Sequence, residues 1–120
     1  MRKKDNDNIT NPILKGVLQV GSFVEFFGMS TMIYGYICRV NNDNTVDYVR
    51  DTLTRWSADT KMVQRGSVIT KDNFISRVKL NAENSGSKIP SVEEVNTVLD
   101  MFKSNFDVNR DEILKALNIG

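Results

Sequence analysis

Residues 12–40 read PILKGVLQVGSFVEFFGMSTMIYGYICRV, and the conformation of this apolar stretch decides the fold. Only Lys15, Glu25 and Arg39 carry a charge in it. Its many aromatic and β-branched residues favour strands, with the glycines at turns or bulges. Residues 16–38 are also long enough to cross a bilayer as one helix, although a mid-bilayer Glu25 would cost on the order of 3 kcal/mol. Strands and a membrane span are two interpretations that stay open.

A third interpretation is a pair of helices over residues 23–37. Gly28 is followed by a hydrophobic and a small polar residue, and Tyr34 and Ile37 lie six and nine positions after it. This spacing resembles that of the helix-turn-helix family, whose second helix reads DNA bases. Here that helix would offer no basic or amide side chain before Arg39.

Three further helices are expected downstream. Val46, Val49, Leu53 and Trp56 fall on one helical face, which predicts a helix over residues 45–56 with Trp56 anchored in the core.

The next two helices form a predicted hairpin. Thr70 is a good N-cap for a helix over residues 71–83, and Ser91 with Glu94 makes a capping box for a helix over residues 92–106. We expect these side chains to be buried together: Phe74, Val78, Val95, Val98, Leu99, Phe102 and Trp56. Beyond them, residues 111–117 favour a short helix, and an extended segment over residues 112–119 stays open.

These patterns predict an α+β fold. Residues 12–120 would form one small single domain, in which the helical hairpin and a third helix pack on a short apolar N-terminal sheet or helix pair. Residues 1–11 are polar and are expected to be a disordered arm.

Residues 69–120 resemble the N-terminal half of the HU and integration host factor family of architectural DNA-binding proteins. Residues 69–78 read ITKDNFISRV, like the opening helix of that family, and residues 89–102 resemble its second helix. Residues 112–120 loosely resemble the strand that follows. The resemblance implies a helical hairpin and a tendency to dimerise, but no DNA-contacting residue of the family can be carried over, because its DNA-gripping arms lie farther along the chain.

The composition excludes several kinds of chemistry. Without histidine there is no Ser-His-Asp or Cys-His catalysis and no histidine metal site, and Cys38 alone makes no disulfide or Cys₄ zinc site. No glycine-rich phosphate loop or calcium loop is present. We therefore expect no catalytic residues, no metal ligands and no cofactor. The thirteen asparagines are typical of an AT-rich genome, such as that of a phage or mobile element.

The net charge of +1 is unevenly distributed. Residues 60–90 hold six basic and two acidic groups, whereas residues 91–120 hold three basic and six acidic groups. Such a basic segment indicates binding to an anionic partner or self-association. The alternative is a solvated surface with uneven charge. The candidate nucleic-acid-binding residues are Arg65, Lys71, Arg77 and Lys79, with the N-terminal Arg2, Lys3 and Lys4.

The sequence thus favours a small, non-enzymatic, DNA-associated or regulatory module that is dimeric and cytoplasmic. Its expected partners are duplex DNA and a second copy or another protein. One alternative is a structural or adaptor protein of a phage or mobile element, which would act through protein–protein contacts and lie in the virion if of phage origin. A small membrane-attached protein is the other alternative.

Overall fold

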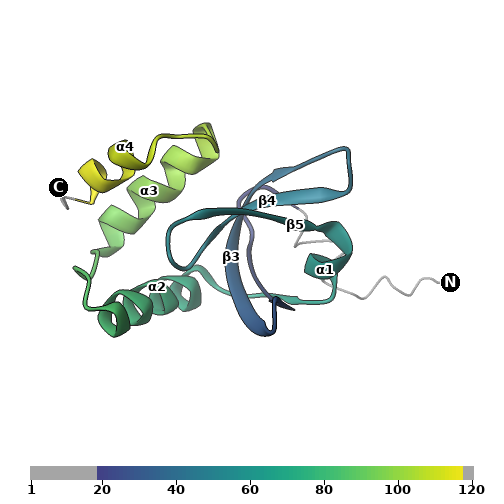
Figure 1. Cartoon of the computed structure of the whole chain (residues 1–120), viewed down its shortest axis with the longest axis horizontal. Helices are drawn as coiled ribbons and strands as arrows, with labels where there is room; N and C mark the ends of the chain where they lie inside the picture. Colours follow the sequence, from purple (N-terminus) through teal and green to yellow (C-terminus); the bar gives the residue numbers. More distant parts are fainter. Residues whose placement is uncertain (1–18, 118–120) are drawn as a thin grey trace, which may run out of the picture.

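The computed structural model describes residues 19–117 and leaves residues 1–18 and 118–120 undescribed. Within the described part, the strands and α1 lie at one end and α2, α3 and α4 gather at the other (Figure 1). In chain order the elements are β2 (Phe23–Gly28), β3 (Thr31–Val40), β4 (Thr45–Arg50), β5 (Arg55–Asp59), α1 (Thr60–Gln64), β6 (Ser67–Val68), α2 (Lys71–Ser85), α3 (Val92–Ser104) and α4 (Arg110–Ala116).

The sheet is antiparallel throughout, with the strand order β5-β4-β3-β2-β6. Strands β2 to β5 form a meander, and after α1 the chain returns so that β6 pairs with the free edge of β2. Gly66 allows this close return, because a Cβ there would collide with the carbonyl oxygen of Glu25. The meander therefore fixes the position of α1 beside β2.

Both faces of the sheet are buried, so the protein has two hydrophobic clusters. The first lies between the sheet and α1: Val24, Phe26, Ile33, Ile37, Val46, Tyr48 and Val63. The second lies between the other face and the C-terminal helices. Its members are Tyr36, Cys38, Val49, Leu53, Phe74, Ile75, Val78, Val95, Val98, Leu99, Phe102, Phe106, Ile113 and Leu117.

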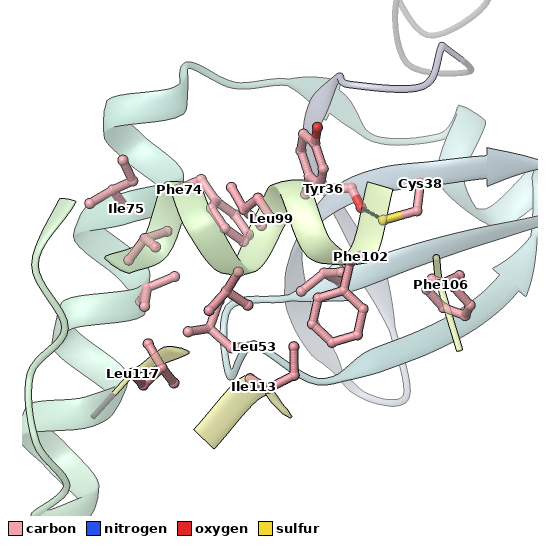
Figure 2. Close-up of a cluster of buried hydrophobic side chains, with 14 residues drawn as sticks. Tyr36, Cys38, Leu53, Phe74, Ile75, Leu99, Phe102, Phe106, Ile113 and Leu117 are labelled. Carbon is pink, nitrogen blue, oxygen red and sulfur yellow. Dashed lines mark hydrogen bonds between the residues drawn. The ribbon is translucent and has the colours of Figure 1, made fainter. Parts of the chain in front are cut away.

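Leu53 belongs to the turn between β4 and β5, yet its side chain lies in the helical cluster near Leu99, Ile113 and Leu117 (Figure 2). Its φ of 60° is in the left-handed region, which a branched side chain rarely adopts. Burial of the side chain, which is only 8% exposed, holds this backbone in place. The turn therefore joins the sheet to the helices.

The helical hairpin begins where the caps predict. Thr70 Oγ1 accepts a hydrogen bond from the Asn73 N–H at 3.0 Å, and both halves of the capping box between Ser91 and Glu94 are present. Gly86, with a φ of 73°, ends α2 in the left-handed conformation that glycine favours. The predicted burial of the hairpin side chains is confirmed: Phe74, Val78, Val95, Val98, Leu99 and Phe102.

The predicted fold class is wrong in its N-terminal half. Residues 45–56 form β4, a turn and the start of β5 rather than a third helix, and a five-stranded sheet replaces the short sheet or helix pair. The helical spacing from Val46 to Leu53 arises because β4 buries both of its faces. Trp56 is 39% exposed, so its predicted role as a core anchor is also wrong.

Two other predictions are corrected by the strands and by α4. Residues 23–37 lie on β2 and β3, so the helix-turn-helix interpretation is wrong. Residues 110–116 are helical, which confirms the short last helix and contradicts the strand implied by the resemblance to HU. Among residues 19–117, no helix is long and apolar enough to cross a membrane. The predicted polar arm over residues 1–11 lies outside the described residues.

Candidate functional site

The four predicted basic residues that lie within the described part occupy different parts of the fold. Arg65 caps the C-terminus of α1, Lys71 begins α2, and both are exposed. Lys79 and Arg77 project about 160° apart around α2, because a helix turns about 100° per residue. The remaining three candidates lie outside the described residues: Arg2, Lys3 and Lys4.

Arg77 is held at the contact between helix and sheet. Its guanidinium carbon lies 4.3 Å from the centroid of the Tyr34 ring, and its Nε is buried without a hydrogen-bond partner. This geometry places the half-buried Arg77 at the contact between α2 and β3. Residues 19–117 together hold twelve basic and thirteen acidic side chains, a net charge of −1.

A different surface is prominent at the turn between β2 and β3. Phe27, Met29 and Met32 are 64%, 59% and 44% exposed, and Phe27 lies opposite Met32 in the strand register. We call these three residues the hairpin tip. Large apolar side chains that cluster in solvent often mark an interaction site.

The backbone of the hairpin tip is strained. Met29 and Ser30 have φ values of 52° and 64°, so both central residues of the turn are left-handed. Two-residue turns of this kind favour Asn-Gly, because a non-glycine residue in this region costs on the order of 1 kcal/mol. The chain therefore keeps an exposed methionine where both solvation and backbone preference disfavour it.

The helix α1 supports the tip from the sheet's other face. A Cβ on Gly28 would lie 2.8 Å from the Met62 sulfur, so Met62 packs directly against the end of β2. Val63 anchors the same helix in the first hydrophobic cluster. Lys61 and Arg65 are exposed on this helix and at its C-cap. The apolar tip thus lies at the end of a strand packed against a helix that carries Lys61 and ends at Arg65.

The second notable feature is a cleft of about 420 Å³ between the β4–β5 turn, α2, the loop after α2, and α4. Leu53, Val78, Ile113 and Leu117 give it buried apolar walls. Its polar lining residues are Asp51, Thr52, Asn81, Ser85, Ser87, Lys88 and Arg110. A volume of this size is within the range of small-molecule sites.

Asp51 is the most deeply buried charged group of the cleft, with 7% exposure. Burial raises the pKa of its carboxyl, and a hydrogen bond from Asn81 and the charges of Arg50 and Arg77 oppose that rise only in part. Lys88 is occupied at the cleft's end, where its Nζ donates to Leu117 O at 2.9 Å and to Glu94 Oε2 at 3.2 Å.

The Cys38 thiol and the Asp47 carboxylate are both buried and hydrogen-bonded within the fold. Burial raises the pKa of the Cys38 thiol to about 12, and its Sγ contacts Tyr36 O at 3.7 Å (Figure 2). Asp47 accepts hydrogen bonds from Arg39 Nε at 2.8 Å and from Ser57 Oγ at 2.6 Å. Over residues 19–117, no three His, Cys, Asp or Glu side chains cluster in a way that could hold a metal ion.

Sequence reasoning missed both the hairpin tip and the cleft. The residues of the tip belong to the apolar stretch 12–40, where nothing distinguishes an exposed methionine from a buried one. The cleft joins residues 51–53 to residues more than twenty positions away, so it arises only from tertiary packing. No known protein family, curated protein or solved structure matches this chain.

Proposed function

We propose that this chain is a non-enzymatic binding module that recognises another protein through the hairpin tip. The observation that carries the proposal is the cluster of Phe27, Met29 and Met32, exposed at a turn whose backbone disfavours the residues it holds. Backbone strain persists where the surrounding structure enforces it and is concentrated at functional sites. A turn selected for stability alone would carry Asn-Gly and polar neighbours.

The apolar side chains of the hairpin tip and the cations on α1 and at its C-cap indicate what kind of surface the partner has. A convex apolar projection fits a concave apolar site, and the flexible thioethers of Met29 and Met32 adapt to its shape. Lys61 lies on α1, the helix that packs against the end of β2, and Arg65 is its C-cap. Neither pairs with a carboxylate among residues 19–117. We therefore infer a partner protein with an apolar pocket and an acidic rim.

A photo-crosslinking amino acid at position 27 tests this function in cells that naturally produce the protein. The matched control carries the same amino acid at position 80, because Leu80 is 42% exposed on the outer face of α2. We expect a discrete adduct with one other protein from position 27 and none from position 80.

Three other outcomes would overturn the proposal. An adduct of twice the chain mass would show that the tip contacts a second copy, as in the dimer expected from the sequence. A nucleic-acid adduct would show that the tip contacts DNA or RNA. Equal labelling from positions 27 and 80, or none from either, would show that the tip is ordinary surface.

Duplex DNA remains a second candidate partner. Lys61, Arg65 and Lys71 support it, because they are exposed close together in the chain and form no ion pairs among residues 19–117. If they contact phosphates, affinity falls with salt by a log–log slope of about −0.9 per phosphate.

The test is a titration with duplex DNA over a range of salt concentrations. Joint replacement of Arg65 and Lys71 by alanine should flatten the slope by about two units. The same double change at Lys103 and Lys115, both exposed on other helices, is the control. Absence of binding by micromolar protein at low salt would exclude this candidate.

A further inference from the structure

The cleft beside the β4–β5 turn contains a buried carboxylate without an ion pair. Asp51 is 7% exposed and lines the cleft. Within the described part, the Asn81 side chain and the backbone N–H of Asp51 itself donate hydrogen bonds to its carboxylate. An ionised carboxylate has about four acceptor positions, so acceptor capacity remains on Asp51.

The two arginines near Asp51 are held by aromatic rings. Arg77 lies over Tyr34 at 4.3 Å, and Arg50 lies over Trp56 at 5.3 Å from the ring centroid. Neither makes an ion pair with Asp51 in the described part of the chain. Their charges favour the ionised carboxylate from a distance, but they leave its direct partner position open.

The walls of the cleft define what else a ligand must carry. Leu53, Val78, Ile113 and Leu117 provide apolar surface that a hydrocarbon body would cover. Lys88 is already neutralised by Glu94. A ligand that joins an ammonium group to a hydrocarbon body matches this cleft. The ammonium would donate further hydrogen bonds to the buried carboxylate, and the hydrocarbon would cover the apolar walls.

We propose that this cleft binds a small organic cation, a protonated amine on an apolar body, with the ammonium on Asp51 and the body against Leu53 and Ile113. The site is separate from the hairpin tip, so the proposal does not depend on the protein-binding function. It adds a small-molecule site to the helical end of the fold.

A titration followed by ¹H–¹⁵N NMR tests this site with hexylammonium, hexanol and hexanoate as probes. We expect hexylammonium to shift the Asn81 side-chain amide and the backbone amides of residues 51–54. Its affinity should exceed that of hexanol by about tenfold or more, which corresponds to one charge-assisted hydrogen bond. Asp51→Asn should reduce hexylammonium to the affinity of hexanol.

Two further variants separate the site from general effects. Asp107→Asn changes an exposed carboxylate paired with Arg55 and should leave binding unchanged. Ala82→Phe adds bulk to a cleft-lining residue and should abolish binding while the spectrum stays dispersed.

Four results would overturn the proposal. One is equal affinity for hexanol and hexylammonium, and another is unchanged binding in Asp51→Asn. The third is absence of binding by every probe. Tighter binding of hexanoate would also contradict it, because Arg110 would then make the cleft an anion site.

Discussion

The guanidinium carbon of Arg77 lies 4.3 Å from the centroid of the Tyr34 ring, so a cation–π contact joins α2 to β3. The Nε of Arg77 is buried and has no hydrogen-bond partner. The ring face is therefore a favourable contact of the guanidinium. A cation that the sequence analysis assigned to DNA binding therefore also belongs to the interface between sheet and helices.

The energy of this contact follows from a double-mutant cycle. Arg77→Met keeps the apolar stem and removes the charge, and Tyr34→Leu removes the ring. We expect a coupling energy of about 0.5–2 kcal/mol between them in urea unfolding. Lys79→Met, on the other flank of α2, should show no coupling with Tyr34→Leu. A coupling near zero for Arg77 would contradict the assignment.

At position 53 we expect a glycine variant to be more stable than an alanine variant. Leu53→Ala should cost about 2–5 kcal/mol, because it leaves a cavity in the helical cluster. Leu53→Gly removes the same side chain but relieves the left-handed φ of 60°. We therefore expect the glycine variant to be about 1 kcal/mol more stable than the alanine variant. Thermal or urea unfolding measures both, and the reverse order would show that the turn is not strained.

Asp47 should contribute stability that depends on pH. Burial favours its neutral form, but hydrogen bonds from Ser57, Asn41 and Arg39 outweigh burial and hold its pKa below the usual value of 3.8. The contribution is therefore present above about pH 4 and is lost as the pH falls. Asp47→Asn should cost about 1–3 kcal/mol at pH 7 and progressively less below pH 4.

The contribution of Asp51 to stability should depend on pH in the opposite direction to that of Asp47. Its pKa is raised by burial, so between the unfolded and the folded pKa values the folded state holds a proton that the unfolded state has lost. The contribution of Asp51 to stability therefore falls as the pH rises above about 3.8. Asp51→Asn should gain stability relative to the parent protein over that range. Parallel pH profiles for the two asparagine variants would contradict both assignments.

Cys38 reports opening of the sheet–helix interface. It is buried, and its pKa is raised to about 12, so the reactive thiolate is scarce in the folded protein. Labelling with a thiol reagent at pH 8 should be at least about a thousandfold slower than in the unfolded chain, because reaction requires opening. Fast labelling under native conditions would show that the interface is open.

Local signals predicted the helical hairpin, but they left strands over residues 12–40 as one of three interpretations and mistook β4 for a helix. Caps at Thr70 and Ser91 act within a few residues, so the sequence reveals them directly. In β4, by contrast, Val46 faces the first cluster and Val49 the second. A strand buried on both faces shows no clean alternation of apolar and polar residues, and its spacing then matches a helix by coincidence.

The candidate sites were hidden for a related reason. Exposed Phe27 and buried Phe26 are neighbours of the same type, and only the fold separates them. The basic residues can be identified in the sequence, but the contact of Arg77 with the Tyr34 ring cannot. Tertiary contacts, which the sequence does not show, therefore decide which of these side chains are exposed.

The hairpin tip is tested most directly by one variant in which two quantities are measured. Met29→Asn with Ser30→Gly installs the preferred turn and removes one apolar side chain. We predict that the free energy of unfolding rises by about 1–2 kcal/mol, because the left-handed strain is relieved. We also predict that the partner adduct from position 27 falls about tenfold or more. A more stable protein with an undiminished adduct would contradict the account, because the strained methionine would then have no part in binding.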